Sequence, residues 1–170
     1  MSAEVIYLIK GDDPILLAQE LNLTIDEVVG PDDPALILED LTLHDEAPAA
    51  AAESAATPSF LAPRRVIVIR EVGRFNAAAV APLIEYLETP VDTATIILGG
   101  GGGTVPAPLV KAIQKAGRVV DAGTPRGKAR TSWVLDNLKA GPVKVETAAA
   151  KRIEQHLGEF SARLEPLLNI

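Results

Sequence analysis

Apolar and polar positions follow two recurring patterns along the first 123 residues. Short runs of Val, Ile and Leu are typical of strands that are buried on both faces. Such runs occur at residues 5–9, 36–38, 65–70, 95–98 and 118–120. Their alternation with helical segments predicts an α/β fold with a mostly parallel sheet and helices on both faces, because right-handed crossovers place helices there.

The segments between these runs carry helix signals. Asp13 is placed to cap a helix whose first turn holds Pro14, and the apolar pattern of that helix fades towards Gly30. Three further helices are expected: the Ala-rich residues 45–56, a helix that begins at Asn76 and continues through Pro82, and one that starts at Pro106 or Pro108 and stops at Gly117.

The character of the chain changes after residue 123. Residues 125–130 are basic and rich in turn formers, and a helix with Trp133 is expected to reach Lys139 before Gly141-Pro142 breaks it. Two short helices are expected beyond that break. We therefore predict an α/β domain with a linker helix at residues 1–140 and a partial helical domain at 141–170. The second piece falls below the roughly 40 residues that an independent core usually needs.

The loop between the Ala-rich helix and the third strand reads TPSFLAP. Pro58 and Pro63 fix the backbone φ angle and remove two hydrogen-bond donors, so the loop should be stiff and lie outside the sheet. Between the prolines stands the apolar pair Phe60 and Leu61. The residues alone leave two interpretations open, a core contact at the strand entrance or an exposed recognition tip.

Composition and charge narrow the classes of function. The chain has 170 residues, 48% of them hydrophobic and 23% charged, which is typical of a globular protein. A net charge of −7 argues against general attraction to nucleic acid. The absence of cysteine excludes disulfides and thiol catalysis. No leader or membrane-length apolar run is visible, so a soluble cytoplasmic protein is expected.

Candidate metal chemistry is sparse. His44 and His156 stand in different segments without a flanking ligand pattern. The acidic pairs Asp12-Asp13 and Asp32-Asp33 both precede prolines at the expected start of an element. Capping and turn formation explain these pairs better than a bound cation does.

Three glycine-containing stretches are candidates for phosphate binding. The turn after the first strand has one glycine and no Lys-Ser/Thr pair, and the stretch from Gly123 to Ala129 misses the P-loop pattern in spacing and in its final hydroxyl. The run from Gly99 to Gly103 is expected to be a loose surface loop. No cofactor is therefore expected. A small nucleotide-binding α/β enzyme with an atypical Gly-rich site remains the alternative.

Several short blocks carry a resemblance to a known family: YLIKGDDP at 7–14, LEDL at 38–41, PSFLAPRRVIVIREVGRF at 58–75, LIEYLETP at 83–90, LVKAIQKAG at 109–117, WV at 133–134 and HLGEFSARLEPLL at 156–168. At these spacings the chain resembles the N-terminal part of the bacterial DNA polymerase III delta subunit. That resemblance implies a degenerate AAA+-like domain without a P-loop, followed by a partial small helical domain.

The resemblance also implies a function. Delta subunits bind the beta sliding clamp and open one of its interfaces during DNA replication, and they have no ATPase activity of their own. The implied clamp-binding residues are Pro58, Ser59, Phe60 and Leu61. The implied protein is a non-catalytic part of the polymerase III holoenzyme. Its other partners would be the delta prime and tau/gamma subunits, with DNA touched indirectly or weakly and no membrane contact.

Two points depart from the family pattern or leave it open. The C-terminal helical collar of the family does not occur in these 170 residues, so we expect clamp contact without a complete loader. Arg126, Lys128 and Arg130 are interpreted as a solvated interdomain linker. A scaffold domain for some other partner is the third hypothesis.

Overall fold

The computed structural model describes residues 4–59, 62–123, 148–149 and 152. The chain divides into two compact units, Met1–Ala122 and Gly123–Ile170. Nearly all described residues belong to the first unit, and the fold given below is that of the first unit. The linker helix and the predicted boundary between residues 140 and 141 lie outside the described residues and remain predictions.

Five strands form one sheet in the order β2-β3-β4-β1-β5. Their bounds are β1 Ile6–Lys10, β2 Leu38–Asp40, β3 Arg65–Ile69, β4 Ala94–Gly99 and β5 Arg118–Asp121. Every neighbouring pair is parallel, and Leu8 of β1, for example, lies opposite Leu98 of β4 and Val119 of β5. All six residues of the central strand β4 are buried. The predicted parallel α/β fold is confirmed.

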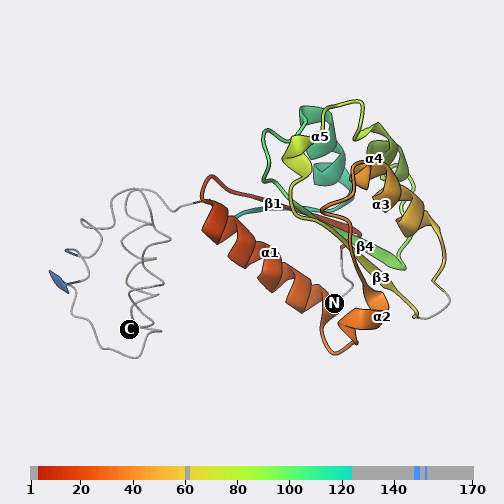
Figure 1. The fold of residues 1–170 in the computed structure, drawn as a ribbon, viewed down its shortest axis with the longest axis horizontal. Coiled ribbons are helices and arrows are strands. Elements are labelled where there is room, and N and C mark those ends of the chain that lie inside the picture. The colour runs from red at the N-terminus through yellow and green to blue at the C-terminus, as the bar shows by residue number, and fades with distance from the viewer. Residues whose placement is uncertain (1–3, 60–61, 124–147, 150–151, 153–170) are drawn as a thin grey trace. The chain divides into compact units, whose positions relative to one another are not determined.

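Helices cover both faces of this sheet (Figure 1). The helix α1, Pro14–Val29, packs on one face, while α3 Ala47–Ala56, α4 Ala81–Tyr86 and α5 Ala107–Ala116 pack on the other. Successive residues of β3 alternate between the two cores, with Val66 facing α1 and Ile67 facing α3. None of the helices in the described part of the chain has the length and apolarity to cross a membrane.

The predicted cap of α1 is confirmed. The Asp13 side chain accepts hydrogen bonds from the backbone N–H groups of Ile15 at 2.9 Å and Leu16 at 3.3 Å. Pro14 occupies the first turn, where its missing N–H costs no helical hydrogen bond. The helix ends at Gly30, whose φ of 56° lies in the left-handed region that glycine tolerates.

Two predicted element starts were wrong. Residues 36–38 were expected to form a strand, but α2 Pro34–Ile37 precedes β2 because the Asp33 side chain accepts from Ala35 N–H at 3.0 Å and starts a helical turn. The helix expected from Asn76 begins only at Ala81, since Pro82 is tolerated in a first turn and not further inside. A short 3₁₀ helix, η1 Val72–Arg74, lies between β3 and α4.

The glycine run Gly99–Gly103 was expected to be a loose surface loop. Gly99 is instead buried at the end of β4, and the N–H of Gly100 donates to the carbonyl of Ile9 at 2.8 Å. A Cβ atom on Gly99 would overlap the carbonyl oxygen of Arg70. The prediction is therefore wrong for these two glycines, which let neighbouring backbones pack closely at the carboxyl end of the sheet.

Candidate functional site

A pocket of about 460 Å³ lies at the carboxyl end of the sheet. The turn containing Gly11 and Asp12, the first half of α1, Arg70, Glu71 and residues 100–103 line it. The chain leaves β1 towards α1 on one face and leaves β4 towards α5 on the other. This is the topological switch point at which open α/β sheets usually bind nucleotides.

The groups around this pocket do not suit a phosphate. A helix N-terminus at this position is the usual binding site for a phosphate. At the N-terminus of α1, the Asp13 carboxylate already accepts hydrogen bonds from two backbone N–H groups. Asp12 and Glu71 add two further carboxyl side chains to the lining. Arg70 donates to Asp40 at 3.1 Å and to the side chain of Asn22 at 2.9 Å, so its guanidinium is engaged away from a ligand.

The electrostatics of Asp40 tie the ends of β2 and β3 together. Partial burial by itself raises the pKa of Asp40, but hydrogen bonds from the Thr42 hydroxyl and N–H, together with the Arg70 guanidinium, outweigh it and hold the pKa below its ordinary value. The Thr42 hydroxyl also accepts from the N–H of Arg70 at 3.0 Å. Asp40 and Arg70 are thus engaged with each other and with neighbouring side chains of the fold.

No group of three or more metal-ligating side chains comes together in the part of the chain that is described. The Nδ1 atom of His44 accepts from the backbone N–H of Glu46 at 3.2 Å, which is a local turn contact. His156 lies outside the described residues. Asp32, from the second acidic pair, forms an ion pair with Arg64 at 2.6 Å.

The second candidate region is the loop of residues 57–64, which joins α3 to β3 at the opposite, amino end of the sheet. Of the four predicted contact residues, Pro58 is exposed and Ser59 is partly buried. The Ser59 hydroxyl accepts from Ala62 N–H at 3.3 Å, across the tip. Phe60 and Leu61 lie outside the described residues, and their role remains a prediction.

The loop leaves α3 through a tight helix end. The Thr57 hydroxyl donates to the carbonyl of Glu53 at 2.8 Å, and the Thr57 N–H donates to the carbonyl of Ser54 at 3.2 Å. These bonds satisfy carbonyls that a helix end otherwise leaves to water. The chain direction at the start of the loop is therefore set by the last turn of α3.

The other end of the loop is fixed on the α1 face of the sheet. Arg64 donates to the carbonyls of Val28 and Val29, both at 2.7 Å, and it pairs with Asp32. Cations are favourable at such a helix C-terminus, because the unpaired carbonyls there carry partial negative charge. Ala62 packs against the apolar core under the same helix.

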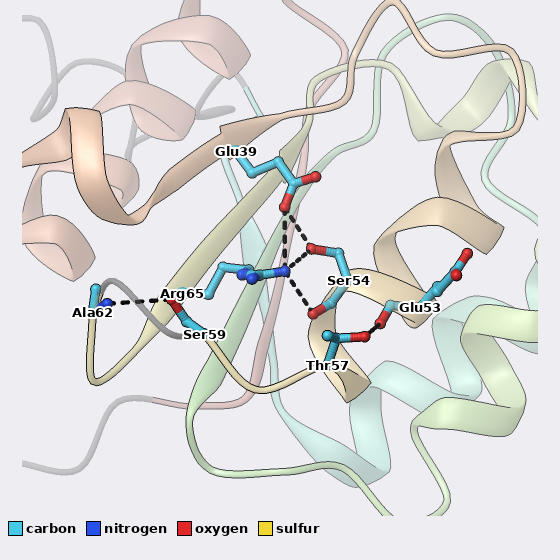
Figure 2. A network of polar contacts seen from close by, with 7 residues as sticks. All are labelled: Glu39, Glu53, Ser54, Thr57, Ser59, Ala62 and Arg65. Atoms are coloured by element: carbon cyan, nitrogen blue, oxygen red, sulfur yellow. Dashed lines mark hydrogen bonds and ion pairs between the residues drawn. The ribbon is translucent and has the colours of Figure 1, made fainter.

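Arg65 fixes the loop on the opposite, α3 face (Figure 2). Its Nη1 atom donates to the carbonyl oxygen and to the hydroxyl of Ser54, and it lies 3.7 Å from a carboxylate oxygen of Glu39. The Ser54 hydroxyl in turn donates to that carboxylate. Arg64 and Arg65 were not among the predicted site residues; the signal in the sequence was two adjacent arginines at the entrance of a buried strand.

A family model described as DNA polymerase III, delta subunit, matches residues 7–122 and therefore more than half of the chain. The chain belongs to the DNA polymerase III delta-subunit family. The matched range of this delta-family chain contains the sheet except for Ile6, together with the 57–64 loop and both arginines. The predicted family is thereby confirmed. No curated protein sequence matches the chain.

Three solved structures share the fold. The Bacillus subtilis DNA clamp loader delta protein has a TM-score of 0.63 at 19% identity, over 98% of this chain and 53% of its own. A Thermotoga maritima DNA polymerase III gamma subunit-related protein has a TM-score of 0.50 at 17% identity, over 83% and 49%. A chain of the E. coli MS115-1 HORMA:CdnC:Trip13 complex has 0.52 at 15%, over 94% and 58%. The delta-family chain thus spans about half the length of these structures.

Proposed function

We propose that this chain contributes the clamp contact of a bacterial clamp loader, by binding the beta sliding clamp through the tip Pro58–Leu61 and holding one interface of the ring open. The observation that carries the proposal is the family match, because it includes this loop. The loop has the features of a recognition element: two prolines, an adjacent apolar pair and a rigid mount on β3.

The physical chemistry of the tip suits insertion into an apolar pocket of a partner. Burying a Phe and a Leu side chain contributes on the order of 3–6 kcal/mol before the cost of association. Pro58 and Pro63 restrict the loop before binding, so that less conformational entropy is lost when the complex forms. An aromatic anchor beside an aliphatic one is a common composition for a binding hot spot.

The proposed role is non-catalytic. The acidic groups and the filled helix cap at the carboxyl end of the sheet argue against nucleotide binding. In a full-length setting the chain would act beside the delta prime and tau/gamma subunits, in the cytoplasm, and touch DNA indirectly or weakly. The net charge of −7 supports a protein partner over general contact with DNA.

The test is binding of the full 170-residue chain to purified beta clamp, followed by surface plasmon resonance or fluorescence anisotropy. Phe60→Ala/Leu61→Ala should raise Kd by roughly 10²- to 10⁴-fold, which corresponds to the apolar burial given above. The thermal unfolding of both proteins is measured in parallel, so that loss of binding is separated from loss of fold.

Leu43→Ala provides the matched control. Leu43 is 92% exposed and lies in the loop after β2, at the other end of the sheet, so its truncation removes an exposed leucine side chain without touching the tip. Its affinity for the clamp should equal that of the wild type. Undiminished affinity in the double variant would overturn the assignment of the tip. Absence of binding by the wild-type chain would overturn the clamp-binding function itself and favour a scaffold for another partner.

A further inference from the structure

Three side chains from three elements meet at the base of the 57–64 loop. Arg65 opens β3, Ser54 lies in the last turns of α3, and Glu39 is the middle residue of β2. Arg65 donates to the Ser54 carbonyl at 2.9 Å and to its hydroxyl, and the Glu39 carboxylate accepts from the Ser54 hydroxyl (Figure 2). The cluster therefore joins the two ends of the loop directly to each other.

The neighbouring arginine fixes the same loop end from the other side. Arg64, the residue before β3, reaches the C-terminus of α1, while Arg65, the first residue of β3, reaches the C-terminus of α3. The point at which the loop enters β3 is thus held on both faces of the sheet. Only Pro63 and Ala62 separate this point from the proposed contact residue Leu61 along the chain.

The Arg65 cluster is a weak source of stability. The Arg65 side chain is 25% exposed and that of Glu39 is 41% exposed, and ion pairs with such access to water contribute little to folding. The fold at β3 rests instead on residues 66–69, which are all fully buried. Removal of the guanidinium should therefore leave the sheet folded while it releases the loop from α3.

We propose that Arg65 is a positioning residue for clamp binding, which holds the base of the 57–64 loop against the end of α3 through Ser54 and Glu39. This inference rests on the proposed function. A guanidinium suits the role because it offers several donors in one plane, whereas lysine is a single point charge on a flexible stem. A loop released from α3 has to be ordered again when the clamp binds, and that ordering weakens affinity.

The experiment compares Arg65→Ala with wild type in clamp binding by the full chain. Ordering one released segment corresponds to a Kd that is higher by about three- to tenfold. Arg65→Lys should fall between the two. The same substitution is then made in a Leu61→Ala background, where one of the proposed contact residues is already truncated. There the change in Kd caused by Arg65→Ala should be smaller than in the wild type.

Two further variants keep the outcome decisive. Arg74→Ala removes an arginine that donates to two carbonyls, those of Thr42 and His44, at the opposite end of the sheet, and it should leave clamp affinity unchanged. Ser54→Ala removes only the bridging hydroxyl and should raise Kd by about two- to threefold, even if Arg65→Ala fails to fold.

The results separate the two proposals. A Kd for both Arg65→Ala and Ser54→Ala equal to that of the wild type would overturn the positioning role while clamp binding stands. An equal loss from Arg65→Ala with and without Leu61 would also overturn it, because a general structural defect is independent of the tip. If the wild-type chain fails to bind the clamp, the proposed function fails, and this inference falls with it.

Discussion

The two ends of the sheet differ in the contacts that their polar groups make. At the carboxyl end, where α/β sheets usually bind ligands, Asp13 caps α1 and glycine backbones pack against the end of β3. At the amino end, Arg64 and Arg65 fix the base of the loop between α3 and β3 to the ends of α1 and α3. At the carboxyl end the polar groups that surround the pocket make internal contacts, while the amino end presents a loop on a rigid base.

This difference supports the proposed partner-binding role for an open α/β sheet whose usual ligand position does not suit a phosphate. The switch point is built by topology and persists whether or not a ligand binds there. The side chains at this point decide its chemistry, and here a carboxylate occupies the position that a phosphate would need. A recognition loop at the far end can then change without disturbing the strand order.

The largest effect on folding stability is expected from Gly99→Ala at the carboxyl end. The new Cβ atom would overlap the carbonyl oxygen of Arg70, and a backbone atom in the sheet has little room to move. We expect the free energy of unfolding to fall by about 3 kcal/mol, the upper end of typical overpacking costs. Urea denaturation followed by circular dichroism measures it.

Gly101→Ala is the matched control for this substitution. A Cβ atom on Gly101 would lie 3.5 Å from the same Arg70 oxygen, at ordinary contact distance, and Gly101 does not have a positive φ. The variant should therefore unfold close to wild type. Equal stability of the two alanine variants would show that the carboxyl end is loosely packed and would remove one side of the comparison.

The next largest effect is expected from Asp13→Ala. Loss of an N-cap side chain that accepts two hydrogen bonds should lower the free energy of unfolding by about 1 kcal/mol. The melting temperature is measured with and without millimolar Mg-ATP. Neither wild type nor variant should gain stability from the nucleotide, because the pocket keeps Asp12 and Glu71 in its lining.

Asp13→Asn is the control for the cap, since asparagine caps about as well as aspartate and should recover most of the loss. A rise in the melting temperature of the wild type with Mg-ATP would contradict the expectation that the pocket at the carboxyl end binds no nucleotide. That result would favour the alternative of a nucleotide-binding enzyme with an atypical Gly-rich site.

Much of the fold could be predicted because local signals and burial agreed. Residues 66–69 of β3 and 96–98 of β4 are all apolar since both faces of the sheet are covered. The Asp13 cap and the proline after it mark the start of α1. Prediction failed where two local signals competed. At residues 36–38 the apolar pattern favoured a strand, but the cap and proline at Asp33-Pro34 imposed a helical turn first.

The candidate site was only partly predictable for a different reason. The tip residues stand together in the sequence, so Pro58 to Leu61 could be proposed from one loop. The residues that hold its base come from distant segments: Arg65 meets Ser54 and Glu39, and Arg64 meets Val28 and Val29. These contacts depend on the strand order, which cannot be predicted from the local patterns of a single sequence. The close packing of Gly99 was missed for the same reason.

The smallest effect on folding stability is expected from the ion pair between Asp40 and Arg70 at the carboxyl end. The pKa of Asp40 is lower in the folded chain than its ordinary value of 3.8, so its contribution to stability is fully present above 3.8 and is lost as the pH falls through the lower folded value. Asp40→Asn should cost about 0.5 kcal/mol at pH 7, since the pair with Arg70 is 40% exposed on each side.

The measurement is the difference in unfolding free energy between wild type and Asp40→Asn from pH 7 down to about pH 2, because that difference removes the titration of all other carboxyl groups. It should shrink as the pH falls below 3.8. Asp92→Asn, on the exposed turn before β4, controls for the loss of one negative charge. A difference that grows on acidification would mean that Asp40 is destabilised by the fold. The carboxyl end would then hold a carboxylate in an unfavourable environment, as functional sites often do. The two ends of the sheet would no longer differ in whether their charged groups stabilise the fold.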